Sequence, residues 1–232
     1  MIHRTLRLMA LPALAALFLA PITASAAPAK PNWNGVVNQD ANGVHTLGNP
    51  AAKVQLTEYV SYTCSHCAAF HKEADAKLRL SYIPQGKVAV RVAQVLRNPV
   101  DLTVAMLTNC GDPKTFFVRH NAFMSSQSQW LAKNASFTPA QTARWTNGDV
   151  PTRLKAIASD FDFYAIMARA NFSRPQVDHC LSNAATMKRV VTQSEASAAQ
   201  GVTGTPSFAI NGALQDGVHD WESLLPLITA KL

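Results

Sequence analysis

The stretch Glu58-Tyr-Val-Ser-Tyr-Thr-Cys64-Ser-His-Cys67 decides the fold of this 232-residue chain. Leading into it, residues alternate between two faces over residues 54–60, which is the period of a β-strand. After it, apolar residues recur at roughly helical spacing until Pro84-Gln85-Gly86, and residues 88–95 form a second, Val-rich strand pattern. A strand, a helix and a strand in this order predict a parallel β-α-β unit with both cysteines at the first junction.

Cys64 and Cys67 are separated by two residues at the start of the predicted helix. A thiolate at that position faces unpaired backbone N–H groups and the positive end of the helix dipole, which lower its pKa. We expect Cys64 to lie exposed at the tip as the attacking thiol, and Cys67 to be shielded one turn further in as the resolving thiol. His66, between them, is expected to stabilise the thiolate.

Two other interpretations of the Cys64–Cys67 pair remain open. One is a structural disulfide, although so short a loop removes little conformational entropy from the unfolded chain. The other is a zinc site, but Cys110 and Cys180 stand alone in the sequence and supply no ligands at matching spacing. The residues favour a redox-active pair and predict no metal ligands.

Glu58 and Pro206 are further candidates for the site. Glu58 shares a strand face with aliphatic residues, so we expect a buried carboxylate that shuttles the proton of Cys67; the alternative is a side chain turned to water. The apolar segment after Gly204 and the turn Asn211-Gly212 predict a hairpin. Pro206 is then either an ordinary edge-strand proline or a cis-proline that turns the backbone of Thr205 towards the cysteines, where it can pair with a substrate peptide.

The region between the second strand and this hairpin is predicted to be helical. Start signals with proline in the first turn recur, at Asn98-Pro99, Asp112-Pro113, Thr138-Pro139 and Ser173 with Pro175. Asp220 is expected to cap a final helix that Pro226 bends or splits. Residues 27–49 are expected to form a lead-in arm with little core of its own. We therefore predict an α/β domain over 27–97 and 201–232, interrupted by a helical insertion domain over 98–200.

The N-terminus has the pattern of a secretory signal peptide over residues 1–26. Arg4 and Arg7 precede an apolar run, and Ala24-Ser25-Ala26 is a small-x-small cleavage site. The run is too short and too interrupted for a comfortable membrane span. The excess of 21 Lys and Arg over 14 Asp and Glu is scattered, which disfavours nucleic acid as a partner. We expect an exported protein in an oxidising compartment, where four cysteines favour disulfides.

Cys110 and Cys180 are expected to form a structural disulfide inside the helical block. Cys110 falls at the end of the helix predicted to begin near Pro99, and Cys180 within the helix predicted to begin near Pro175. The loss of chain entropy in the unfolded state predicts that a disulfide closing the long loop between them stabilises the fold by about 4 kcal/mol. This fits a structural disulfide better than a catalytic pair. The alternative is two buried free thiols.

The residues from Glu58 to Cys67, together with Gly204-Thr205-Pro206-Ser-Phe208, resemble the DsbA-like branch of the thioredoxin superfamily, the exported thiol:disulfide interchange proteins. Gly48-Asn49-Pro50 also fits this family. The resemblance implies an α/β thioredoxin fold with an inserted helical domain. By position, it implies a nucleophile, a resolving thiol, a buried acid and a cis-proline at Cys64, Cys67, Glu58 and Pro206.

The chain departs from this family pattern at two positions that tune redox potential and substrate release. Ser65 stands where the best-known oxidase has proline, and Thr205 precedes the proline as in isomerase relatives. The strength of oxidation is therefore left open. Residues 27–50 are too short for the N-terminal dimerisation domain of a V-shaped isomerase, which favours a monomer.

The resemblance implies a periplasmic enzyme, without a cofactor, that introduces disulfides into reduced, unfolded exported polypeptides. It also implies reoxidation by a membrane partner of the DsbB type. One alternative is a disulfide isomerase or reductase of the DsbC/DsbG type, kept reduced by another partner. A less favoured one is a module that binds a metal such as copper(I) through its thiols, because no Met/Cys/His cluster accompanies the motif.

Overall fold

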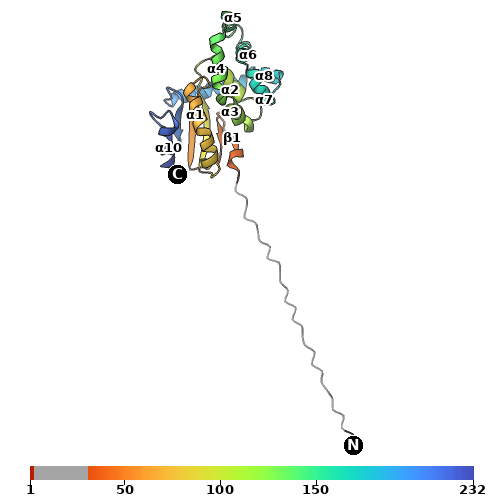
Figure 1. Ribbon diagram of the computed structural model, residues 1–232, viewed down its shortest axis with the longest axis vertical. Helices are drawn as coiled ribbons and strands as arrows, with labels where there is room; N and C mark the ends of the chain where they lie inside the picture. The colour runs from red at the N-terminus through yellow and green to blue at the C-terminus, as the bar shows by residue number, and fades with distance from the viewer. Residues whose placement is uncertain (3–30) are drawn as a thin grey trace. The chain divides into compact units, whose positions relative to one another are not determined.

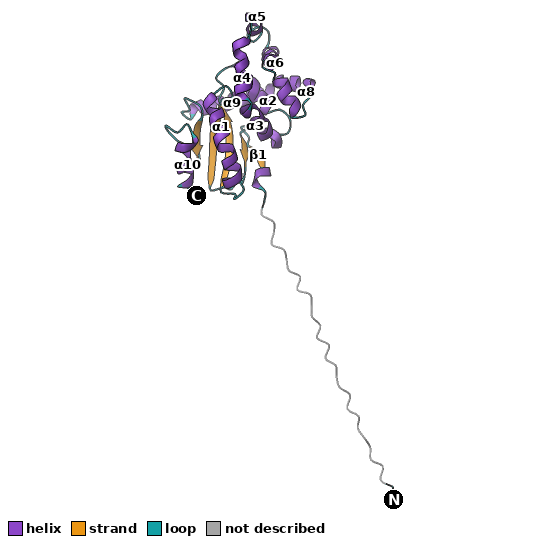
Figure 2. Ribbon diagram, in the orientation of Figure 1, coloured by secondary structure: helices purple, strands orange, loops and turns teal. Residues whose placement is uncertain are grey.

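The central sheet has six strands in the spatial order β1-β2-β4-β3-β5-β6. The computed structural model describes residues 1–2 and 31–232, so the predicted signal peptide over 1–26 lies outside the described residues apart from its first two. The strands are β1 (Val37–Gln39), β2 (His45–Leu47), β3 (Val54–Val60), β4 (Val88–Gln94), β5 (Ser207–Ile210) and β6 (Ala213–Leu214). Figure 2 shows them in orange, with the helix α1 (Ser65–Lys77) in front.

The parallel pair β3 and β4 forms the middle of the sheet, with Glu58 opposite Val92. α1 and a π-turn at Leu78–Tyr82 connect the two strands, which confirms the predicted β-α-β unit. β5 pairs antiparallel with the other edge of β3, and the predicted turn leads on into β6. Asn211 and Gly212 have φ values of 53° and 84°, as a tight two-residue hairpin turn requires.

β1 and β2 come from the segment that was expected to be an arm with little core of its own, and that expectation is wrong. β2 pairs antiparallel with β4, and His45 and Leu47 are each only 2% exposed. Asp40 closes the hairpin by accepting hydrogen bonds from the backbone N–H groups of Asn42 and Val44 at 2.9 and 3.0 Å. Strands of three residues are too short to show a period of two, so their sequence does not distinguish them from a loop.

Eight α-helices lie between β4 and β5 in the chain, where helices were predicted. They are α2 (Pro99–Thr108), α3 (Phe116–Ser125), α4 (Gln127–Ala132), α5 (Pro139–Ala143), α6 (Val150–Asp160), α7 (Phe163–Arg169), α8 (Arg174–Leu181) and α9 (Ala184–Ala199). α2, α5 and α8 begin at the predicted proline signals, whereas Asp112-Pro113 begins a 3-10 turn before α3. Figure 1 shows most of these helices above and beside the sheet. Residues 31–232 form one compact unit, and the division into two domains stays a prediction.

The last helix, α10 (Trp221–Thr229), packs against α1. Phe70 of α1 lies between Phe208 and Trp221, with ring-centroid distances of 4.5 and 6.4 Å. Pro226 was expected to bend or split this helix; the split does not occur, because α10 runs unbroken through Pro226. A proline here removes one backbone hydrogen bond, and the burial of the apolar face of α10 outweighs that loss. No helix in the described part of the chain has the length and apolar character needed to cross a bilayer.

Candidate active site

The two cysteines lie at the junction of β3 and α1, as predicted. Cys64 is the N-cap residue of α1, and Cys67 lies in its first turn. Cys67 is fully buried, as expected, but the expectation that Cys64 is exposed is wrong: its exposed fraction is 5%. The loop that precedes β5 covers it, and in its thiol form the Cys64 Sγ donates a hydrogen bond to the Thr205 carbonyl at 3.0 Å. Both cysteines are free thiols in this structure.

Hydrogen bonds set the acidity of Cys64. The Cys67 thiol makes the largest contribution, and Thr205 and the backbone N–H groups of Cys67 and His66 add to it. Together they outweigh burial and lower the pKa of Cys64 to about 4. Cys64 is therefore a thiolate at neutral pH. His66 contributes through its backbone N–H, and its side chain is exposed to solvent.

Cys67 has the opposite acidity. Burial is the main cause that raises the pKa of Cys67 far above that of an ordinary thiol, and its hydrogen bond to Cys64 and the charge of Glu58 act in the same direction. Cys67 therefore holds its proton at neutral pH while Cys64 has lost its own. In the reduced protein, Cys64 is therefore the ionised thiol of the pair and Cys67 the protonated one.

Glu58 lies beneath the cysteine pair, with an exposed fraction of 5%, as the alternation along β3 predicted. Burial first, and then the charges of Asp75 and Cys64, raise the pKa of Glu58 to about 8. Its Oε1 has no hydrogen-bond partner among the described residues. Glu58 also lines a cavity of about 20 Å³ together with His71 and Asp75, which is enough room for one water molecule. Such a carboxyl group can exchange a proton near neutral pH.

The peptide bond between Thr205 and Pro206 is cis, and the Thr205 carbonyl contacts the Cys64 sulfur. This is the arrangement that the sequence suggested for Thr205 and Pro206. His219, in the turn before α10, lies with its Nδ1 at 2.8 Å from the Pro206 carbonyl. His219 was not predicted as a site residue, since nothing in its sequence neighbourhood distinguishes it from a surface histidine.

Asp101 of α2 holds the loop that carries Cys64, and it was also missed. Its carboxylate accepts hydrogen bonds from the Ser61 hydroxyl at 3.0 Å and from the Thr63 and Arg97 backbone N–H groups at 2.8 and 2.9 Å. Asp101 is fully buried. Its sequence signal is only that of an acidic residue in the first turn of a helix, which usually faces water.

Gln127 of α4 holds the same loop from the other side. Its Nε2 donates to the carbonyl oxygens of Tyr62 at 2.8 Å and of Cys64 at 2.7 Å. The Tyr62 hydroxyl in turn donates to Thr108 at 3.1 Å and lies 3.0 Å from the His120 Nδ1. The helices that follow β4 therefore fix the backbone from which α1 begins.

Comparison with known proteins identifies this arrangement. A family model described as Thioredoxin matches residues 40–230 of the chain. The chain belongs to the thioredoxin family. A protein-disulfide isomerase from Novosphingobium aromaticivorans has a similar solved structure, with 48% identity, a TM-score of 0.78, and coverage of 82% of this chain and 97% of that one.

A second thioredoxin-fold structure extends the likeness to the DsbA-like proteins. The alpha-DsbA1 of Wolbachia pipientis has a TM-score of 0.60 and 24% identity, and the match covers 80% of this chain and 88% of that one. This confirms the predicted α/β thioredoxin fold of DsbA-like type.

Curated relatives carry names from the same class of enzymes. A Rickettsia felis protein, provisionally named protein-disulfide oxidoreductase, is 29% identical over 181 residues, covering 77% of this chain and 56% of that protein. A similarly named protein of Rickettsia conorii is 28% identical over 180 residues, with 77% and 56% covered. The chain therefore spans about half the length of the curated relatives it matches.

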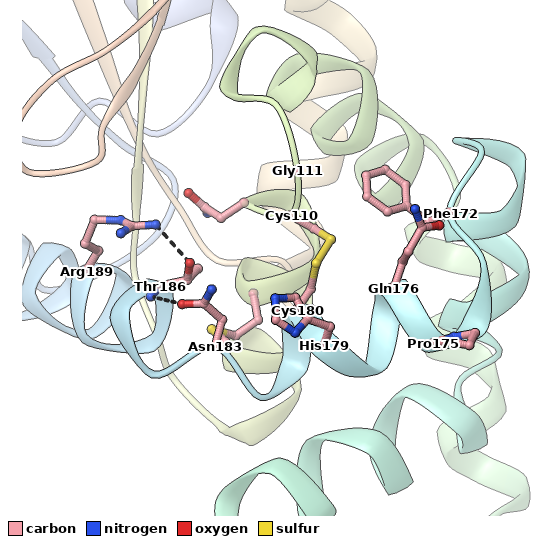
Figure 3. Close-up of a pocket in the computed structure, with 12 residues that line it drawn as sticks. Cys110, Gly111, Phe172, Pro175, Gln176, His179, Cys180, Asn183, Thr186 and Arg189 are labelled. Atoms are coloured by element: carbon pink, nitrogen blue, oxygen red, sulfur yellow. Dashed lines mark hydrogen bonds between the residues drawn. A yellow bond between two sulfur atoms is a disulfide. The ribbon is translucent and has the colours of Figure 1, made fainter.

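Cys110 and Cys180 form a disulfide that joins α8 to the turn after α2, across a sequence separation of 70 residues. Figure 3 shows this bond at the wall of a cavity of about 580 Å³, with Phe172, His179 and Arg189 also lining it. The bond is separate from the Cys64–Cys67 pair, whose thiols are both free. Residues 31–232 and the first two residues contain no group of three or more His, Cys, Asp or Glu side chains that could hold a metal ion.

Proposed function

We propose that this thioredoxin-family chain is a thiol:disulfide oxidoreductase that acts on reduced, exported polypeptides through Cys64 and Cys67. The observation that carries the proposal is the opposite acidity of two adjacent thiols beside a cis-proline: a pKa of about 4 for Cys64 and a strongly raised one for Cys67. A structural disulfide has no need of such a difference. The names of the relatives agree with this class of reaction.

The proposed reaction starts from the oxidised Cys64–Cys67 disulfide. A substrate thiolate attacks the Cys64 Sγ, the bond between the two cysteine sulfurs breaks, and Cys67 leaves with the electron pair and takes up a proton. The high pKa of Cys67 means that this proton must arrive at once, and the protonated carboxyl of Glu58 is the proposed donor. Glu58 then regains a proton from solvent.

A second thiolate of the substrate completes the reaction. It attacks the substrate sulfur of the mixed disulfide, a disulfide forms within the substrate, and Cys64 leaves as a thiolate that its hydrogen bonds stabilise. Two electrons pass from the substrate to the cysteine pair. The Thr205 backbone beside Cys64 is the proposed pairing edge for an extended substrate segment.

The direction of net transfer distinguishes the two candidate activities. A low pKa of Cys64 stabilises the reduced enzyme and thereby makes the disulfide more oxidising, which supports an oxidase of the DsbA type. The similar structure from Novosphingobium aromaticivorans is named an isomerase, which supports isomerase or reductase activity as the second candidate. An oxidase also requires a reoxidant, for which we propose a membrane protein of the DsbB type. We further propose a monomer that a signal peptide over residues 1–26 directs to the periplasm.

Redox equilibration with glutathione tests this proposal. A reduction potential above about −150 mV, with rapid oxidation of a reduced two-cysteine peptide, is expected for the oxidase. A more negative potential, with faster rescue of a scrambled disulfide substrate than oxidation of a reduced one, is expected for the isomerase. Absence of both activities in the wild-type protein, with Cys64→Ser behaving identically, would contradict the whole class.

A further inference from the structure

A cleft of about 340 Å³ lies between the end of β4, the start of α2 and the start of α6. We call it the arginine cleft and define it by six of its lining residues, namely Leu96, Arg97, Leu102, Trp145, Val150 and Arg153. Its apolar members are only half-buried, so the cleft presents apolar surface to solvent. In Figure 1, α5 and α6 lie at the top of the view. The cleft has room for one or two side chains of a bound segment.

The arginine cleft carries two cations that form no salt bridge among the described residues. Arg97 is exposed, and neither Arg97 nor Arg153 forms a salt bridge with any described residue. The Nε of Arg153 is shielded from solvent and has no hydrogen-bond acceptor among the described residues. A shielded guanidinium N–H without an acceptor costs free energy, which a bound carboxylate would recover.

The carboxylates of the elements that form the cleft are engaged elsewhere. Asp149 caps α6 by accepting from the Thr152 backbone N–H at 2.8 Å. Asp160 accepts from the Trp145 indole N–H at 2.7 Å and pairs with Arg144. Asp101 points inward to the loop before Cys64. The charge of Asp149 acts on Arg153 without a salt bridge, so both guanidinium groups can still bind the carboxylate of a ligand.

The arginine cleft is joined to the active site through Asn98. The Asn98 Nδ2 donates to the Thr63 Oγ1 at 2.9 Å, and Thr63 immediately precedes Cys64. The Arg97 backbone N–H and the Thr63 backbone N–H bind the same carboxylate of Asp101. The cleft therefore adjoins the loop that precedes Cys64.

We propose that the arginine cleft binds a segment of the client polypeptide in which a large apolar side chain adjoins Asp or Glu. The apolar side chain would pack on Trp145 and the leucines, and the carboxylate would bind Arg153 and Arg97. This inference rests on the proposed function, since it names a class of client for the Cys64–Cys67 pair. The cleft contributes to binding and takes no part in the sulfur chemistry.

Direct binding tests the arginine cleft without any thiol chemistry. Cysteine-free peptides that differ only in a Leu-Glu-Asp or Leu-Gln-Asn segment are titrated into the full chain, with the Trp145 indole N–H followed by NMR. We expect the acidic peptide to bind about threefold to tenfold more tightly, as one or two partly exposed charged hydrogen bonds would give. Equal affinity for the two peptides, or no shift of the Trp145 signal, would overturn the proposal.

Variants assign the preference to the cleft. Arg153→Gln and Arg97→Gln, each made separately, should abolish the preference for the acidic peptide. Because Arg97 is exposed, Arg97→Gln should fold and keeps the test valid if Arg153→Gln fails to fold. Lys155→Gln removes the same charge from α6 outside the cleft and should preserve the preference. A loss of preference in Lys155→Gln, or its retention in both arginine variants, would contradict the proposal.

Kinetics separate this inference from the proposed function. The substrates are two-cysteine versions of both peptides, which carry the segment at several distances on either side of the cysteines. The arginine variants should raise KM for the acidic peptide alone. The kcat for both peptides and the rate of reaction with dithiothreitol should not change. If the wild-type chain oxidises neither peptide nor dithiothreitol but still binds the acidic peptide selectively, the proposed function is wrong and the proposed binding role of the cleft is retained. An equal rise of KM for both peptides would contradict the proposed preference of the cleft for the acidic segment.

Discussion

The side-chain amide of Gln127 lies 2.7 Å from the carbonyl oxygen of Cys64 and binds it from a helix 63 residues further along the chain. The same nitrogen also donates to the Tyr62 carbonyl, so one amide group satisfies two buried acceptors of the active-site loop. Gln127 is itself 3% exposed. The position of the first turn of α1, and with it the hydrogen bonds that lower the pKa of Cys64, therefore depends on a side chain of the helical region.

Gln127→Leu tests this dependence. The substitution keeps a side chain of similar size but leaves the Tyr62 and Cys64 carbonyls without a donor, which should lower the free energy of unfolding by about 2 kcal/mol. The pKa of Cys64 should rise, because the loop that presents it is less well fixed. Urea unfolding and the pH dependence of alkylation measure the two effects. Gln129→Leu, on the exposed side of α4, is the matched control and should change neither.

The acidity of Cys64 is a second prediction. Iodoacetamide should alkylate reduced Cys64 with a midpoint near pH 4, while Cys67 stays unreactive to high pH. Cys67→Ala removes the hydrogen bond that contributes most to this low pKa, so the midpoint should move up towards the value of a free thiol, about 8.5. Peptide mapping after alkylation identifies the modified residue. A wild-type midpoint at the free-thiol value would contradict the assigned roles of both cysteines.

The sequence predicted the parts of the molecule that have a local signal. The alternation in β3 placed Glu58 inside, the cysteine spacing placed the thiols at the start of α1, and the Asn211-Gly212 turn placed the hairpin. The hairpin of β1 and β2 was missed because three residues carry no period. The burial of Cys64 was missed because it depends on Thr205, which is 141 residues away in sequence.

The residues that support the site could not be predicted either, because their contacts are with residues distant in sequence. Asp101 and Gln127 have ordinary sequence contexts, a helix first turn and a helix start, in which both residue types usually face water. Only the packing of α2 and α4 against the loop before α1 gives them buried acceptors and donors to bind. Their roles follow from tertiary structure and have no signature in one sequence.

The disulfide between Cys110 and Cys180 is predicted to stabilise the fold without serving the reaction. The double variant Cys110→Ala/Cys180→Ala should lose about 2–4 kcal/mol of unfolding free energy, since the bond closes a loop of 70 residues. The rate at which Cys64–Cys67 oxidises a reduced peptide should stay within about twofold of wild type at a temperature where both proteins are folded. Thermal unfolding and peptide oxidation measure these two quantities. A large loss of activity in the folded variant would contradict a purely structural role.

Glu58 gives the last prediction, a stability that falls as pH rises. The folded-state pKa of about 8 lies above the ordinary value of 4.5, so between these two values the folded protein keeps a proton that the unfolded chain has released. The stabilisation is complete below about pH 4.5 and is lost as pH rises through about 8. Each pH unit inside that window lowers the free energy of unfolding by up to about 1.4 kcal/mol.

Glu58→Gln removes this titration and keeps the size of the side chain. The variant should be more stable than wild type by a few kcal/mol near pH 9, with a flatter dependence of urea unfolding on pH. It should also slow the departure of Cys67 at neutral pH, because the proposed proton donor is gone, so that mixed disulfides with a substrate peptide accumulate. Glu73→Gln, half-exposed on α1, is the matched control and should leave both the pH dependence and the lifetime of the mixed disulfide unchanged. An unchanged pH dependence in Glu58→Gln would show that the carboxyl ionises in the folded protein as it does in water.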